Sequence, residues 1–208
     1  LLLGTAAILA AEKERQPELV DFISHPVNRG PGAAFRTGLI ALLDCAGDGD
    51  IIITMDADNT HNVKTIRLLL NKLDEGYEVV VASGWAPGGM MIGIPFMRWV
   101  FTFGCNRLYR LLFPIRGVTC YTGFFKGFRV AGLREVRTRY GGEIIGCDGF
   151  AGMAELQIRC RRIPLFCAEV PFLMRFDQRK GASHIRILRT IREHLGIFCR
   201  NLLDRKVV

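Results

Sequence analysis

Two acidic residues separated by one alanine are the strongest candidates for chemistry in this sequence. Residues 50–61 read D-I-I-I-T-M-D-A-D-N-T-H, so Asp56 and Asp58 directly follow an apolar, β-branched run. Such a run is typical of a strand that is buried on both faces inside a parallel sheet. Two carboxylates at the end of that strand could hold Mg²⁺ or Mn²⁺ together with phosphate oxygens. The alternative is structural: Asp-Ala-Asp-Asn would only end the strand and cap the next helix.

A glycine-rich stretch at residues 28–38, N-R-G-P-G-A-A-F-R-T-G, is a second candidate site. Pro31 suits the first turn of a helix, which we expect to extend to about Leu43. The stretch does not fit a dinucleotide-binding fingerprint, because Phe35 stands where the third glycine belongs and the strongest strand comes after it. Two interpretations stay open. The N–H groups at the helix start could face a phosphate, or the glycines could serve ordinary turn chemistry.

Helices and strands alternate around these residues. Residues 66–73 keep the spacing of a helix with one buried face, and Y-E-V-V-V-A at 77–82 predicts the next strand. This alternation predicts an α/β layered domain with ligands outside the carboxyl ends of its strands. We also expect helices at 4–13 and 147–161, and strands at 20–23, at the end of 117–129 and at 163–172. On the helix at 147–161, Glu155 could be a general base or an ion-paired residue.

Two segments mix apolar and basic residues. Residues 88–113 are rich in aromatic side chains interrupted by arginines, and Arg98 and Thr102 would share one face of a helix over 95–113. That helix could lie in a membrane interface, or it could be half of an ordinary buried helix pair. Residues 175–206 carry nine Lys or Arg against three acids, and their apolar residues fall along one helical stripe. This helix would suit anionic lipid better than nucleic acid, for which the segment has no recognised motif.

The composition limits the class of protein. With 208 residues, half of them hydrophobic, the chain can form one sizeable core, and its net charge of +8 favours anionic partners. The seven cysteines form no C-x-x-C pair, which favours reduced thiols over a disulfide frame or a zinc site. No apolar stretch is long enough to span a membrane, and no basic flank precedes the first leucines, so we expect no signal peptide. Because the sequence does not begin with Met, we expect a fragment.

In order along nearly the whole chain, the motifs resemble those of the inverting family-2 glycosyltransferases. The closest likeness is to the dolichyl-phosphate mannosyltransferase-like branch, which transfers sugars to polyprenyl phosphates. The matching motifs are N-R-G-x-G-x-A at Asn28, D-A-D-x-x-H at Asp56, V-V-A-S at Val80, G-G at Gly88, the Arg98 and Thr102 pair, E-V-P at Glu169 and R-K-G-A-S at Arg179. The resemblance implies an α/β, GT-A-like (Rossmann-like), mostly parallel sheet flanked by helices, with amphipathic interfacial helices. Residues 1–175 would form this domain and residues 176–208 a basic amphipathic segment.

The resemblance also implies a reaction and roles for particular residues. A sugar would pass, with inversion, from a nucleoside-diphosphate sugar to a polyprenyl phosphate at the cytoplasmic face of a membrane. The chain would be peripheral there, or anchored by a segment outside it, and would bind no nucleic acid. Asp58 and Arg179 would be catalytic, with Mg²⁺ or Mn²⁺ on Asp56 and Asp58. The expected nucleotide-sugar contacts are Asn28, Asp56, Ala57, Asp58 and Arg179, and the expected acceptor-phosphate contacts are Arg98, Thr102, Lys126, Ser183 and His184.

The sequence offers few candidate general bases, and the implied reaction does not need a strong one. A phosphate monoester is already anionic, so its oxygen can attack the anomeric carbon without a strong base. The leaving diphosphate needs a cation and fixed positive charges, which Asp58 with its metal and Arg179 would supply.

Several positions depart from the family pattern. Gly84 stands at a usual arginine, Cys120 at an aspartate, Lys126 at an arginine and His184 at a lysine. The family's first strand and the pocket for the nucleoside base are missing, since only Gly4-Thr5 remains of its opening motifs. We therefore expect weak nucleotide-sugar binding by this chain alone and an exposed sheet surface. The alternative function is a catalytically impaired protein of the same fold that binds a nucleotide sugar or a lipid phosphate.

Overall fold

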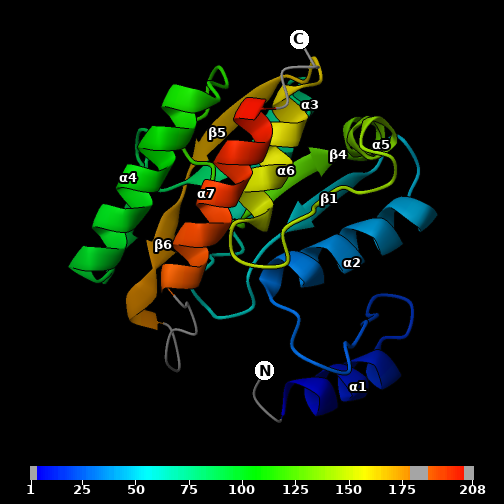
Figure 1. The fold of residues 1–208 in the computed structure, drawn as a ribbon. Coiled ribbons are helices and arrows are strands. Elements are labelled where there is room, and N and C mark those ends of the chain that lie inside the picture. Colours follow the sequence, from blue (N-terminus) through cyan, green and yellow to red (C-terminus); the bar gives the residue numbers. More distant parts are fainter. Residues whose placement is uncertain (1–3, 179–186, 204–208) are drawn as a thin grey trace.

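The computed structural model describes residues 4–178 and 187–203 of the chain. Figure 1 shows the fold. In these residues the main sheet has four strands in the order β1-β4-β2-β5, and a second sheet pairs β3 with β6. The strands are β1 (Ile51–Thr54), β2 (Val79–Ser83), β3 (Met90–Ile92), β4 (Lys126–Arg129), β5 (Cys167–Pro171) and β6 (Leu173–Arg175). The helices are α1 (Thr5–Arg15), α2 (Pro31–Cys45), α3 (Thr65–Asp74), α4 (Phe96–Leu112), α5 (Val130–Arg139), α6 (Gly152–Arg161), the 3-10 turn η1 (Phe176–Gln178) and α7 (Ile187–Leu203).

Three of the four strands in the main sheet run in the same direction. β2 and β5 pair in parallel, whereas β4 lies antiparallel between β1 and β2. The expected mostly parallel α/β sheet is therefore confirmed, with β4 as the exception. Because β1, β2 and β5 share a direction, their carboxyl ends point to the same side of the sheet, where the prediction places the ligands.

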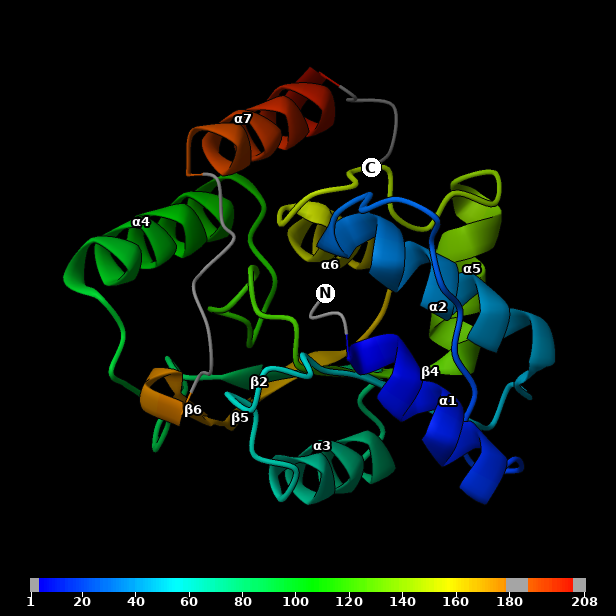
Figure 2. The same ribbon diagram turned by 90° about the horizontal axis from the view of Figure 1, so that it is seen from below.

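Helices cover both faces of this sheet. Figure 2 shows α3 on one face and α2, α5 and α6 on the other, with α4 and α7 side by side beyond α6. On the α3 face, Leu69 and Leu73 pack with Val80 and Phe125. On the opposite face, residues of α2, α5 and α6 form the largest core cluster, which contains Leu39, Leu43, Phe128, Leu133 and Leu156. A third cluster joins α4, α6 and α7.

The prediction that β1 is buried on both faces within a parallel sheet is wrong. β1 lies at an edge of the main sheet, and its only described partner, β4, is antiparallel. Its burial alternates, with Ile52 and Thr54 buried and Ile51 and Ile53 only partly so. β-branched residues favour a strand, but they do not determine how many neighbours it has.

Two further predictions about elements need correction. The strand expected at 20–23 does not form: no described strand pairs with these residues, and Ile23 is 57% exposed. The predicted helix at 147–161 begins only at Gly152, because residues 147–150 form the turn that meets α2. The helices expected at 4–13, 66–73 and 95–113 and the strand at 77–82 are confirmed, each to within a few residues. The helix α5 and the β3-β6 pair were not predicted.

Candidate functional site

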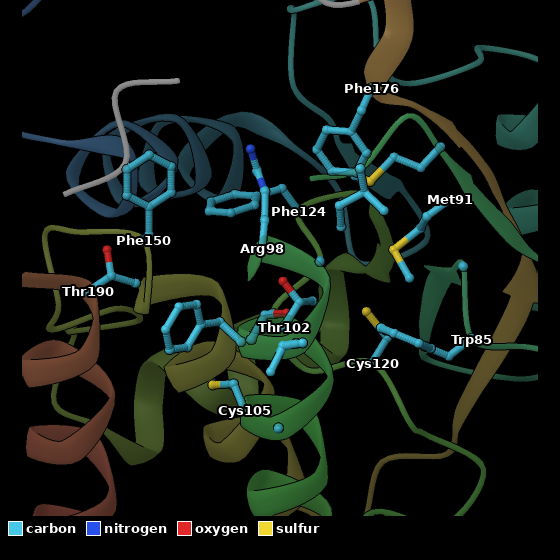
Figure 3. A pocket seen from close by; sticks show the side chains of 18 of the residues that line it. Trp85, Met91, Arg98, Thr102, Cys105, Cys120, Phe124, Phe150, Phe176 and Thr190 are labelled. Atoms are coloured by element: carbon cyan, nitrogen blue, oxygen red, sulfur yellow. The ribbon is translucent and has the colours of Figure 1, made fainter. Parts of the chain in front are cut away.

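A cavity of about 800 Å³ lies between the end of β1, the end of β2, α4 and α7. Figure 3 shows the side chains that α4, α7 and the neighbouring loops direct into it. Aromatic and aliphatic residues make up most of its wall. Its polar lining includes Asp56, Asp58, His61, Arg98, Thr102, Thr122, Thr190 and His194. Residues that lie some 40 positions apart in the sequence, the aspartates and the Arg98 and Thr102 pair, thus line one space.

The aspartates lie on a tight turn directly after β1. Asn59 has a φ of 65°, a left-handed conformation that asparagine tolerates better than most residues. The backbone N–H and the hydroxyl of Thr60 both donate to Oδ1 of Asp58, at 3.1 and 2.6 Å. This turn brings both carboxylates to the cavity and leaves Ala57 exposed between them.

His61 contacts this turn and holds its backbone in place. Its Nδ1 accepts the backbone N–H of Asp56 at 3.0 Å, and its ring stacks on Phe125 and meets the edge of Phe172. Burial lowers the pKa of His61 to about 4, so the ring is neutral at physiological pH. In the sequence, His61 is only the last residue of the D-A-D-x-x-H motif, and no role was predicted for it.

The aspartate pair fits a divalent cation that also binds a diphosphate. Mg²⁺ and Mn²⁺ are commonly held by one or two carboxylates while phosphate oxygens and water complete the shell. Among the described residues, no group of three or more His, Cys, Asp or Glu could hold a metal ion by itself. The two carboxylates are a donor set that suits a cation of this kind.

Arg98 and Thr102 lie one turn apart on α4 and both line the cavity (Figure 3). The guanidinium carbon of Arg98 lies 4.6 Å from the centre of the Phe176 ring, a cation–π contact that orients the side chain. The helical spacing inferred from the sequence is therefore correct. The sequence could not show that Arg98 contacts Phe176, because Phe176 follows 78 positions later in the chain.

Two polar side chains, the buried Asn106 and the partly buried Glu169, hold the loop at residues 117–123. This loop carries three cavity residues, Cys120, Thr122 and Gly123. Asn106 of α4 accepts the backbone N–H groups of Tyr121 and Thr122 through Oδ1, at 2.6 and 3.2 Å. The carboxylate of Glu169, on β5, accepts the backbone N–H groups of residues 119 and 120 and the Thr119 hydroxyl. A single Asn within an apolar helix could have indicated that Asn106 holds this loop, but this role was not predicted.

Lys126 does not lie at the acceptor-phosphate site that the resemblance implies. Its side chain is fully buried at the start of β4, and its Nζ donates to Tyr121 O, Met153 O and Gln157 Oε1, at 3.1, 3.3 and 2.8 Å. It is not among the residues that line the cavity. Burial lowers the pKa of Lys126 to about 8. The expected contact with an acceptor phosphate is therefore not supported, because the amine faces carbonyl oxygens inside the protein.

Two departures from the family pattern lie in the cavity wall. A Cβ at Gly84 would come within 2.8 Å of Met91 Cγ, so the side chain of Met91 occupies the space where a longer residue would begin. Burial raises the pKa of the Cys120 thiol to about 11, which leaves it neutral. Figure 3 shows Met91, Trp85 and Cys120 together at one side of the cavity. Gly84, Met91 and Cys120 thus add no charge to the cavity wall.

The start of α2 does not face a ligand. The backbone N–H groups of Gly32 and Ala33 donate to the carbonyls of Gly149 and Asp148, each at 3.1 Å. Asn28 is exposed, and its Oδ1 accepts the N–H of Gly30 at 3.0 Å. The phosphate interpretation of this stretch is therefore wrong and the turn interpretation is correct. Asn28 does not line the cavity, so its expected contact with the nucleotide sugar is a prediction without geometric support.

Glu155 has a structural role. Its Oε2 accepts the backbone N–H groups of Gly146 and Cys147, and its Oε1 lies 3.2 Å from Arg159 and 3.6 Å from Arg200. The ion-paired alternative is correct. Arg179, Ser183 and His184, the remaining predicted site residues, lie outside the described residues.

The α4 and α7 helices present a broad apolar surface beside the cavity. Trp99 and Phe103 stack at 5.3 Å and both contact Trp85, at 5.8 and 5.6 Å. Exposed apolar residues on the two helices include Phe96, Met97, Phe101, Leu108, Leu111, Leu188 and Leu195. None of the described helices has the length and apolar character required to cross a bilayer.

Comparisons with known proteins place the fold and the motifs in a family. Polyprenol monophosphomannose synthase of Mycolicibacterium smegmatis is 25% identical over 168 residues, which are 81% of this chain and 61% of that relative. The crystal structure of glucosyl-3-phosphoglycerate synthase from Mycobacterium tuberculosis in complex with phosphoglyceric acid superposes with a TM-score of 0.56. The alignment has 16% identity and covers 99% of this chain and 66% of that one, so the likeness concerns the fold. The family model described as "Glycosyl transferase family 2" matches residues 4–137, well over half of the sequence, and the chain belongs to that family.

Proposed function

We propose that this chain carries the acceptor side and part of the donor side of a glycosyltransferase. The enzyme would transfer a sugar, with inversion, from a nucleoside-diphosphate sugar to a polyprenyl phosphate at the cytoplasmic face of a membrane. One observation carries the proposal: a single, mostly apolar cavity is lined by a carboxylate pair and by an Arg-Thr pair. The first suits a diphosphate with its cation, and the second suits a phosphate monoester attached to a lipid.

At the donor end, Asp56 and Asp58 would hold the divalent cation, Mg²⁺ or Mn²⁺. When bound, this cation neutralises charge that develops on the leaving diphosphate. The hydrogen bonds from Thr60 fix one oxygen of Asp58, so the carboxylate is oriented before the ligand arrives. Arg179 remains a proposed second cation for the diphosphate.

At the acceptor end, Arg98 and Thr102 would bind the phosphate monoester. A guanidinium and a hydroxyl supply charge-assisted hydrogen bonds that orient one phosphate oxygen toward the anomeric carbon. This oxygen is anionic, so the reaction needs no strong base. Besides the two aspartates, the described cavity lining offers His61 and His194 as bases, and burial lowers the pKa of each to about 4. One displacement at the anomeric carbon inverts its configuration.

The lipid part of the acceptor is supported by the apolar wall and the neighbouring surface. Phe101, Ile191 and Leu195 bring apolar atoms of α4 and α7 to the cavity, and exposed apolar residues continue along both helices. The polyprenol monophosphomannose synthase acts, by its name, on a polyprenol. The present chain spans 61% of that relative's length, so its whole reaction and its partners are proposals. We assign residues 1–175 to the glycosyltransferase domain and residues 176–208 to a basic amphipathic segment.

A sugar-transfer assay tests the function. The chain, with Mn²⁺ or Mg²⁺, radiolabelled nucleoside-diphosphate sugars and polyprenyl phosphate in vesicles, should form a labelled lipid. Asp58→Ala should abolish the product, whereas Asp74→Ala, at the exposed end of α3, should leave the rate unchanged. Labelled lipid that forms equally well with Asp58→Ala would contradict the proposal.

A second candidate function is favoured by the uncharged residues Gly84, Met91 and Cys120 in the cavity wall. A protein that lacks an arginine and an aspartate at two cavity positions could bind a nucleotide sugar or a lipid phosphate without transferring the sugar. Binding of polyprenyl phosphate that depends on Arg98, together with no labelled product under any metal condition, would favour this alternative.

A further inference from the structure

The His61 ring carries its proton on one particular nitrogen. A backbone N–H is always a donor, and that of Asp56 points at Nδ1 of His61 at 3.0 Å. Nδ1 must therefore be the unprotonated acceptor, so that Nε2 of this neutral ring carries the hydrogen. The structure thus fixes both the tautomer and the direction of the Nε2–H group.

This Nε2–H group is buried and, among the residues that the structure describes, has no hydrogen-bond acceptor. Its nearest carboxylate atom is Oδ2 of Asp56, 3.9 Å away, beyond the range of a hydrogen bond. A buried donor without an acceptor costs free energy, which would be regained if the acceptor moved closer. Buried polar groups are rarely left in this state, so the orphaned donor requires an explanation.

The neighbours of the imidazole hold it in place, so a hydrogen bond from Nε2 needs a shift of the Asp56 carboxylate. The rings of Phe125 and Phe172 contact the imidazole at centroid distances of 5.0 and 5.2 Å, one stacked and the other edge-on. These contacts and the Asp56 N–H hold the imidazole in place. The Asp56 side chain is 36% exposed and borders the cavity. A shift of roughly 1 Å in its carboxylate would bring Oδ2 within hydrogen-bond range of Nε2.

We propose that His61 is a positioning residue for the cation site, an inference that rests on the proposed function. When Asp56 takes a divalent cation through one oxygen, Nε2–H of His61 donates to the other, Oδ2. This hydrogen bond fixes the orientation of the carboxylate and lowers the cost of forming the loaded site. In metal sites, partners that orient the ligands commonly change affinity by tenfold or more.

Two substitutions separate this role from a purely structural one. Asn at position 61 can place an acceptor near the present position of Nδ1 and so keep the bond to the Asp56 N–H, but it loses the distal donor. Gln can place an amide N–H near the position of Nε2 but loses the acceptor. Binding of Mn²⁺ alone and with GDP or UDP, followed by the paramagnetic resonance signal of free Mn²⁺, is the measurement. Circular dichroism and thermal unfolding report whether each variant folds.

The proposal predicts that His61→Asn binds Mn²⁺ about tenfold more weakly than the wild type, whereas His61→Gln stays close to it. A structural role alone predicts the reverse order, which would overturn the proposal. Loss of folding in His61→Asn would also overturn it. In the wild type, long-range ¹H–¹⁵N correlation spectra should show the proton on Nε2, and a proton on Nδ1 would refute the assignment.

The same measurements distinguish failure of this inference from failure of the proposed function. If the wild type binds Mn²⁺ but both variants bind equally well, only the role of His61 is wrong. If the wild type binds no Mn²⁺ with or without a nucleotide, both are wrong. If the variants rank as expected but no sugar transfer occurs, the positioning role holds and the transferase assignment fails.

Discussion

At the scale of single residues, the buried polar side chains of this protein mostly hold backbone in place. The buried Asn106 and Lys126, with the partly buried Glu169, bond backbone groups of the loop that carries Cys120 and Thr122 into the cavity. Lys126 has a charge and a motif position that suggest a phosphate ligand, but its amine faces protein carbonyls. A buried cation of this kind is retained because its loss would leave several acceptors without a donor.

Substitution of Lys126 by Met should therefore affect stability rather than phosphate binding. We expect the free energy of unfolding to fall by about 3 kcal/mol, because the carbonyls of residues 121 and 153 and the Gln157 amide oxygen lose their donor. Urea denaturation measures the change. Lys64→Met, at an exposed position, should leave the midpoint almost unchanged. Unaltered stability with loss of polyprenyl phosphate binding would restore the original interpretation of Lys126.

At the scale of elements, α7 closes one side of the cavity, and a partly buried hydrogen bond joins it to α4. Nδ1 of His194 and the hydroxyl of Tyr109 are 2.7 Å apart, and Ile197 and Phe198 pack into the cluster that α4 and α6 form. Burial lowers the pKa of His194 to about 4, below its ordinary value of 6.5. Protonation of the ring is thus coupled to the attachment of this helix.

The sign of the resulting pH dependence follows from linkage. Between pH 6.5 and 4 the unfolded chain binds a proton at His194 that the folded chain does not, so stability falls as the pH is lowered through this window. The loss from this group amounts to about 3 kcal/mol at most. Urea midpoints at pH 7.5, 5.5 and 4.5 should show the loss in the wild type and a smaller loss in His194→Gln. Equal slopes in the wild type and in His194→Gln would contradict the prediction.

The start of α2 depends on close backbone contact with the turn before α6. A Cβ on Gly32 would lie 2.1 Å from Cys147 O and 2.7 Å from Gly149 O, whereas a Cβ on Gly38 of the same helix would meet nothing within 4 Å. Gly32→Ala should therefore destabilise the protein by about 3 kcal/mol through forced separation of the two backbones. Gly38→Ala should stabilise it by up to about 1 kcal/mol through helix propensity. Thermal unfolding of both variants tests this pair, which fails if the two alanines have the same effect.

At the scale of the whole molecule, charge and apolar surface favour the same kind of partner. The net charge is +8, and the exposed aromatic and aliphatic residues of α4 and α7 lie beside the cavity. The protein has two tryptophans, Trp85 and Trp99, and both belong to the aromatic group at this surface. Their fluorescence should therefore report whether the surface meets lipid.

Vesicles containing anionic phospholipid should shift the tryptophan emission to shorter wavelength, and added salt should weaken the binding because the attraction is partly electrostatic. Leu111→Asp should reduce the affinity about tenfold, since an exposed apolar contact becomes a charge. The matched control is Leu19→Asp: Leu19 is 80% exposed and Leu111 is 75% exposed, but Leu19 lies outside α4 and α7. Equal losses in the two variants, or tighter binding to RNA than to vesicles, would contradict the membrane proposal.

The sequence alone determined the family, the α/β class, most of the helices and the residues at the two ends of the cavity. Short-range rules suffice for these, because apolar periodicity, strand-ending carboxylates and one-turn spacing on a helix depend on neighbours in the chain. The antiparallel β4, the edge position of β1, the burial of Lys126 and the contact between the α2 start and residues 148–149 could not be read from it. Each depends on which distant segments meet, and the same local pattern is compatible with several partners. Only the tertiary structure fixed the surroundings of His61, because Phe125 and Phe172 contact its ring from positions far along the chain. One ring nitrogen accepts the Asp56 N–H, and the other has no acceptor among the described residues.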